Sequence, residues 1–181
     1  MSKKNVGIIV LGGLVFVSLV YWLLRVRAGS PEGVAVGESA PSFALPALGH
    51  GTASLDEYRH KVVLVNFWAT WCPPCVEEAP SLEKFAEAMR PQGVVVIGVS
   101  VDQDPAALAK FVADHHLTFP IVRDPYQRLA HRYGTFQFPE TYILDRDGRV
   151  ADKVVGEWDW QDPRLIDFVR DLAHPGERAS R

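Results

Sequence analysis

The chain has 181 residues, 48% hydrophobic and 23% charged, a balance typical of globular proteins, and it contains no repeat or low-complexity tract. Its formal net charge is −3. Without the four basic residues that flank an apolar run near the N-terminus, 15 basic and 22 acidic residues remain and give −7. This acidic balance argues against nucleic acid as a partner.

The apolar run extends from Asn5 to Leu24 without a charge, about the ~20 helical residues that the hydrocarbon core of a bilayer requires. Two lysines before it favour a cytoplasmic N-terminus, although two arginines after it weaken that signal. The alternative is a cleaved signal peptide, but the run is longer than the usual ~7–15 apolar residues. We therefore expect residues 1–27 to form a cytoplasmic tip and an uncleaved transmembrane anchor.

Residues 28–40 are rich in Gly, Pro and small side chains and lack periodicity, which indicates a linker. The remaining sequence predicts one folded domain over residues 41–173, long enough for a single hydrophobic core, and a short tail over residues 174–181.

The first predicted elements of the domain surround its cysteines. The stretch from Phe43 to Ser54 is compatible with a small hairpin that turns at a Gly-His-Gly sequence. The run V-V-L-V-N-F over residues 62–67 is typical of a strand buried on both faces, and V-V-V-I-G-V over residues 94–99 is a second one. Between them, residues 82–89 repeat apolar side chains at helical spacing.

Three Asp-Pro pairs follow, each placing an N-cap acceptor before a proline that suits the first helical position. They predict helices over about residues 105–115, 125–133 and 163–172. Before the last of these, T-Y-I-L-D and R-V-A-D-K-V-V flank a turn that ends in Gly148, which predicts a hairpin. The alternation of strands and helices predicts a three-layer α/β domain with a mixed sheet.

Only two cysteines are present, Cys72 and Cys75, in a Cys-Pro-Pro-Cys sequence between the first buried strand and a helix. The first sulfur then lies at the helix N-terminus, where unpaired N–H groups favour a thiolate and lower a thiol pKa from ~8.5 into the range ~3.5–7.5. Two intervening residues let the second sulfur reach the first. This spacing indicates a disulfide that opens and closes.

Two structural readings of the cysteines are less favoured. A static disulfide across so short a loop constrains the unfolded chain little. A structural zinc ion needs four ligands, and no second Cys-x-x-Cys or His-x-x-x-His occurs; His115, His116 and His131 are better read as solvated residues at helix ends.

The sequence V-V-L-V-N-F-W-A-T-W-C-P-P-C resembles the active-site strand and turn of thioredoxin-fold proteins. With G-E-S-A-P-S-F, S-L-D-E-Y and Y-G-T-F-Q-F-P-E-T-Y-I-L-D-R-D-G, it resembles the membrane-tethered TlpA/ResA-type thiol-disulfide oxidoreductases over about residues 37–172. The resemblance implies a thioredoxin-like α/β fold, with a mixed central sheet flanked by helices. It also implies an inserted helix and strand over about residues 102–119.

The same resemblance assigns the site residues. Cys72 is implied as the attacking, more exposed sulfur and Cys75 as the resolving one. Pro139 matches a cis-proline opposite the disulfide, which leaves the backbone of Phe138 available to an extended client segment. Phe138 is bulkier than the usual residue before this proline. Trp71 is a candidate for client binding and equally for packing the loop.

Asn66 stands where ordinary thioredoxins carry a buried Asp, so the proton-handling carboxylate must lie elsewhere. Glu78 is the candidate, three residues after Cys75 on the same helix; its alternative role is a charge that complements the helix dipole. Of Trp158 and Trp160, we expect at least one at the surface, as a docking contact or as packing on the final helix.

These observations predict an extracytoplasmic thiol-disulfide oxidoreductase in the inner or plasma membrane, with no cofactor besides the cysteine pair. By resemblance it reduces client cysteines, such as those of cytochrome c maturation or copper sites, and is itself reduced by a membrane thiol relay. The alternatives are a peroxiredoxin-like peroxidase, which needs Pro and Thr where Val65 and Ala69 stand, and a Cu(I) chaperone.

Overall fold

The computed structural model describes residues 33–49 and 51–176, together with residue 18. The chain divides into two compact units, Met1–Glu32 and Gly33–Arg181, and the elements described below belong to the second. No helix among the described residues is long and apolar enough to cross a membrane. The expected anchor over residues 5–24 lies, apart from residue 18, outside the described residues and stays a prediction.

The centre of the domain is a five-stranded mixed sheet in the order β5-β4-β3-β6-β7. β3 runs parallel to β4 and antiparallel to β6, so the two long apolar runs of the sequence become the two central strands. The strands are β3 (Val62–Trp68), β4 (Val94–Ser100), β5 (Ile121–Arg123), β6 (Glu140–Leu144) and β7 (Val150–Val155). The predicted mixed sheet and closing hairpin are therefore confirmed.

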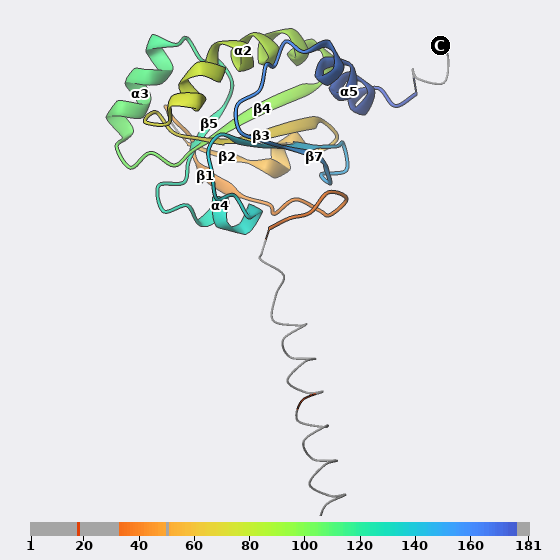
Figure 1. Cartoon of the computed structure of the whole chain (residues 1–181), viewed down its shortest axis with the longest axis horizontal. Helices are drawn as coiled ribbons and strands as arrows, with labels where there is room; N and C mark the ends of the chain where they lie inside the picture. The colour runs from red at the N-terminus through yellow and green to blue at the C-terminus, as the bar shows by residue number, and fades with distance from the viewer. Residues whose placement is uncertain (1–17, 19–32, 50, 177–181) are drawn as a thin grey trace, which may run out of the picture. The chain divides into compact units, whose positions relative to one another are not determined.

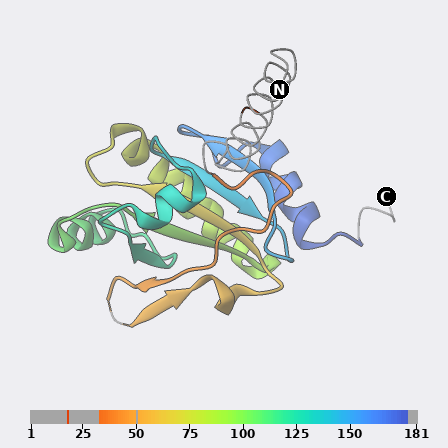
Figure 2. The same cartoon turned by 90° about the horizontal axis from the view of Figure 1, so that it is seen from below.

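Helices cover both faces of this sheet. On one face lie α2 (Pro73–Met89), α3 (Pro105–Asp114) and α5 (Pro163–Ala173), and on the other lies α4 (Arg128–Tyr133) (Figure 1). Seen from below, α4 and the segment that leads into the small hairpin cross the second face (Figure 2). That hairpin pairs β1 (Ala44–Pro46) with β2 (Thr52–Ser54), and a short 3-10 helix over Leu55–Tyr58 follows it.

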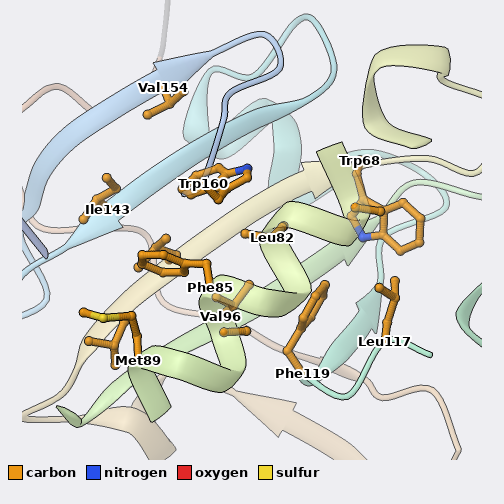
Figure 3. Close-up of a cluster of buried hydrophobic side chains, with 14 of the residues drawn as sticks. Trp68, Leu82, Phe85, Met89, Val96, Leu117, Phe119, Ile143, Val154 and Trp160 are labelled. Atoms are coloured by element: carbon orange, nitrogen blue, oxygen red, sulfur yellow. The ribbon is translucent and has the colours of Figure 1, made fainter. Parts of the chain in front are cut away.

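Alternation along β3 divides the core between the two faces, because successive side chains of a strand point in opposite directions. Val62, Leu64 and Trp68 join the cluster under α2 and α5, whereas Val63, Val65 and Phe67 join the cluster under α4. Figure 3 shows the first cluster, in which Trp160 and the α2 side chain of Phe85 lie over the sheet. Asn66 takes the remaining position of β3 on this face and is buried.

Close packing in this cluster depends on a glycine in β4. A Cβ atom at Gly98 would lie 2.9 Å from Nε1 of Trp68 and 3.0 Å from the ring of Phe119. The absence of a side chain at this position therefore makes room for the indole.

Two of the three predicted Asp-Pro caps are confirmed. Asp104 accepts a hydrogen bond from the backbone N–H of Ala106 at 2.8 Å, and Asp162 accepts one from Arg164 at 2.9 Å. Each aspartate lies directly before the proline that begins α3 or α5.

The prediction for the remaining Asp-Pro pair, Asp124 with Pro125, was wrong, because α4 begins at Arg128 and not at residue 125. Residues 124–127 form a turn instead, closed by a 2.8 Å hydrogen bond from the N–H of Gln127 to the carbonyl of Asp124. The Asp124 carboxylate nevertheless accepts the N–H groups of Arg128, Leu129 and Ala130 at 2.8–2.9 Å. It therefore satisfies the first turn of α4 from outside the helix.

The inserted helix and strand that the resemblance implies over about residues 102–119 are present as α3 and β5. β5 begins just beyond this range, at Ile121, and forms the edge of the sheet next to β4. The three residues of β5 pair with Gly98, Val99 and Ser100 of β4, so this strand is defined by contacts between distant parts of the chain.

The boundary placed near residue 40 was also wrong, because residues 33–40 are bonded to the domain. The N–H of Val34 donates to the carbonyl of Tyr133 at 3.2 Å, and the N–H of Gly37 donates to the carbonyl of Val150 at 2.8 Å. Arg149 binds the carbonyl of Gly37 through its guanidinium at 3.0 Å. The domain therefore begins at Gly33, and the backbone bonds that bind this segment leave no periodic side-chain pattern in the sequence.

Candidate functional site

The two cysteines form a disulfide at the junction between β3 and α2. Cys72 is the N-cap residue of α2, and its sulfur accepts the backbone N–H of Cys75 at 3.4 Å. The predicted place of the first sulfur at the helix N-terminus is therefore confirmed. Both cysteines are buried in this disulfide state, at 5% and 2% exposure, so exposure does not separate the attacking sulfur from the resolving one.

The turn before Cys72 is held by a buried aspartate at the end of β4. Asp102 accepts hydrogen bonds from the backbone N–H of Thr70 at 3.1 Å, from the Thr70 hydroxyl at 2.6 Å and from the Ser100 hydroxyl at 2.8 Å. Sequence analysis missed this residue. Its position two residues after a buried parallel strand was the available signal, because functional groups gather at the carboxyl ends of such strands.

Glu78 lies on α2 below Cys75, and its side chain is buried. Its carboxylate accepts hydrogen bonds from Asn66 Nδ2 at 3.0 Å, from the backbone N–H of Trp158 at 3.3 Å and from Trp160 Nε1 at 3.2 Å. Glu78 and Cys75 also line one small cavity of about 10 Å³. The carboxylate is thus held by two distant parts of the chain, and its residue lines the same cavity as Cys75.

The environment of Glu78 raises its pKa from the ordinary 4.5 to about 7. Burial is the main cause, because it disfavours the charged form, and the negative charge of Glu157 acts in the same direction. The hydrogen bonds from Trp160, Asn66 and Trp158 lower the pKa but do not outweigh burial. The carboxyl group can therefore exchange a proton near neutral pH.

The cis-proline loop reaches the same end of the sheet. The peptide bond between Phe138 and Pro139 is cis, and the pairing of Phe67 with Glu140 places this bond beside the end of β3. Trp71, which is 63% exposed, packs edge-on against Phe138 with ring centroids 6.2 Å apart. The backbone N–H and carbonyl of Phe138 make no hydrogen bond to another described residue.

The structure therefore brings together the predicted site residues from three segments. Cys72, Cys75 and Glu78 come from the start of α2, Trp71 from the turn before it, and Phe138 with Pro139 from the loop before β6. Their chemical roles stay predictions. The contacts that the sequence did not indicate are those of Trp158 and Trp160, which lie 80 and 82 residues after Glu78.

The two tryptophans differ in exposure, as expected. Trp158 is 44% exposed, whereas Trp160 is fully buried and packs against Phe85 of α2 with ring centroids 5.7 Å apart. Trp160 therefore packs on α2, in a buried cluster that also includes Leu165 and Val169 of the final helix. Among the described residues, no three His, Cys, Asp or Glu side chains are grouped so that they could hold a metal ion.

Comparison with known proteins places this site in a family. Residues 36–153 match the AhpC/TSA family model. The thiol-disulfide oxidoreductase ResA of Geobacillus thermodenitrificans is 37% identical over 123 residues, which cover 68% of this chain and 71% of that protein. The chain belongs to the ResA/TlpA-type thiol-disulfide oxidoreductases of the AhpC/TSA family.

Two further proteins that are similar to this oxidoreductase agree with its fold and activity. ResA of Bacillus subtilis is 27% identical over 178 residues, which cover 97% of this chain and 98% of that protein. The crystal structure of a putative thiol:disulfide interchange protein DsbE from Chlorobium tepidum matches with a TM-score of 0.71 and 28% identity, covering 76% of this chain and 99% of that one. The fold is thioredoxin-like, the activity is thiol-disulfide exchange, and the peroxidase alternative is not favoured.

Proposed function

We propose that this protein is a membrane-anchored, extracytoplasmic reductase that transfers two electrons from the Cys72–Cys75 dithiol to disulfides of client proteins. The observation that carries the proposal is the joint placement of Cys72 at the N-terminus of α2 and Glu78 below Cys75. The first favours a nucleophilic thiolate, and the second supplies a proton acceptor for the other cysteine. No other redox group takes part.

The reaction proceeds in two exchange steps. The Cys72 thiolate attacks a client disulfide, forms a mixed disulfide and releases one client thiolate. The Glu78 carboxylate takes the proton of Cys75, and the resulting Cys75 thiolate attacks the Cys72 sulfur. This second attack forms the Cys72–Cys75 disulfide and releases the second client thiolate, so the client gains the two electrons that the dithiol loses.

Client binding is assigned to the loop opposite the disulfide. The unbonded backbone groups of Phe138 are available to pair with an extended client segment, as strands pair at a sheet edge. Trp71 and the ring of Phe138 offer an apolar surface beside Cys72. Pro139 supports this loop at the end of β3.

The proposed location rests on the apolar run over residues 5–24 and on the resemblance to tethered oxidoreductases. One structural neighbour with 26% identity and a TM-score of 0.69 is described as a secreted thiol-disulfide isomerase from Corynebacterium glutamicum. The clients that suit a reductase at this location are cysteines of cytochrome c maturation or of copper sites. A membrane thiol relay would return the dithiol to its reduced state.

Trapping of clients tests the roles of the two cysteines. In Cys75→Ser the attacking thiolate remains but resolution is lost, so mixed disulfides with clients should accumulate on non-reducing gels. Cys72→Ser should trap none and should lose disulfide reduction. Trapping by Cys72→Ser alone would reverse the two roles.

A redox titration of the dithiol tests the proposed direction. We expect the reduced protein to transfer its electrons to client disulfides at equilibrium. A dithiol that instead oxidises reduced clients would contradict the assignment as a reductase, although the exchange chemistry would stand.

A further inference from the structure

A surface groove of about 310 Å³ lies beside Glu78, on the side of α2 that faces the loop after β7. Its most exposed large apolar side chain is the Trp158 indole, which is 44% exposed. Tryptophan is enriched among the side chains that contribute most to binding at protein interfaces. The groove is lined by Glu77, Glu78, Ser81, Glu157, Trp158 and Asp159.

Two hydrogen bonds from backbone N–H groups link this groove to the redox site. The N–H of Trp158 donates to the Glu78 carboxylate at 3.3 Å, and the N–H of Gly156 donates to the carbonyl of Pro139 at 2.9 Å. The loop that carries the indole is therefore fastened both to the residue below Cys75 and to the cis-proline loop. A client segment held at Phe138 can extend toward Trp158 over neighbouring parts of the same surface.

The charges around the indole have one sign. Glu77, Glu157 and Asp159 are exposed, and the lining contains no Lys, Arg or His. The ion pairs found among the described residues use none of these three carboxylates. Glu157 is near enough to Glu78 to raise the pKa of that carboxyl. An aromatic face with carboxylates around it is complementary to a cationic side chain.

We propose that the Trp158 groove binds a lysine or arginine side chain of the client, close in sequence to the cysteines being reduced. The cation lies on the indole face, and Glu77, Glu157 and Asp159 provide the opposite charge. This inference deepens the proposed reductase function and rests on it: the groove selects clients with a basic residue near their disulfide, and Cys72 and Cys75 perform the exchange.

Matched peptides test this selection. The whole chain, purified in detergent and reduced beforehand, is mixed with peptides that contain one disulfide and differ only by lysine or glutamine at each position near it. The second-order rate constant of a single turnover needs no recycling partner. For the best position we expect the lysine peptide to react about tenfold faster at low salt. This ratio should fall toward one as ionic strength rises.

Variants of the groove test whether its residues cause the preference for the lysine peptide. Glu157→Gln and Trp158→Ala should each lower the lysine-to-glutamine ratio by severalfold. Glu87→Gln is the matched control, because Glu87 is exposed on the same helix as Glu77, about 15 Å further along its axis, and should leave the ratio unchanged.

The outcomes separate this inference from the proposed function. If both peptides react at the same rate at every position and salt concentration, the groove is not a cation site, although the reductase function stands. If neither peptide is reduced, the proposed function itself fails. A ratio that persists in both Glu157→Gln and Trp158→Ala would place the selection elsewhere on the surface and overturn the inference.

Discussion

At the scale of single residues, the raised pKa of Glu78 makes the stability of the fold depend on pH. An acid whose pKa is higher in the folded chain than in the unfolded chain binds its proton more tightly when folded. Its stabilising contribution is complete below the unfolded pKa, near 4.5, and is lost as the pH rises through the folded pKa of about 7. The difference between these two pKa values corresponds to a loss of ~3 kcal/mol.

Glu78→Gln should remove this loss, because glutamine does not ionise. The measured quantity is the free energy of unfolding of the variant minus that of the unmodified protein. This difference should be ~2–3 kcal/mol larger at pH 8 than at pH 4.5. Urea unfolding of both oxidised proteins at the two pH values measures the change, with Glu87→Gln as the exposed control. An equal difference at both pH values would show that the pKa of Glu78 is not raised.

At the scale of elements, the central strands are packed too closely to accept a larger side chain at one position. Gly98 of β4 faces the Trp68 indole and the Phe119 ring, and a Cβ atom there would approach both to about 3 Å. We expect Gly98→Ala to lower the free energy of unfolding by ~1–3 kcal/mol, as overpacking does. Gly176→Ala, where nothing lies within 4 Å, is the control.

A second substitution distinguishes this clash from a change in strand preference. Trp68→Phe shortens the side chain that Gly98 accommodates, so the cost of Gly98→Ala should be smaller in the Trp68→Phe background. Urea unfolding of the four proteins in the cycle gives the coupling. If Gly98→Ala lowers the free energy of unfolding equally in both backgrounds, contact with the indole is not the cause of the destabilisation.

The elements also show how far the sequence could predict the fold and the site. β3, β4 and the start of α3 follow from local signals: apolar runs, and an aspartate directly before a proline. The later start of α4 does not, because the Asp124 carboxylate caps it across a turn. The cysteines and Glu78 could be found from spacing along one helix. Trp158 and Trp160 could not be assigned to Glu78, because tertiary packing alone joins segments 80 residues apart.

At the scale of the whole molecule, the bonds of residues 33–40 change where the domain meets the segment before it. Because Val34 and Gly37 are fastened to the domain, residues 28–32 remain as the connection to the expected anchor, in place of residues 28–40. A domain tethered in this way would have to meet its clients and its electron donor at the membrane surface. Retention of the N-terminal segment would therefore decide where the proposed reductase meets its clients.

Membrane fractionation tests this retention. The apolar run predicts that the chain stays in the membrane pellet after alkaline carbonate washing and that the domain is accessible to protease from outside the cytoplasm. Leu14→Arg places a charge near the middle of the run, which costs ~2.5–3.5 kcal/mol for insertion, and should shift protein into the supernatant. Leu14→Ala, the uncharged control, should remain in the pellet. A mature protein that begins near Gly29 would show that the segment is cleaved, and the reductase would then act as a free domain.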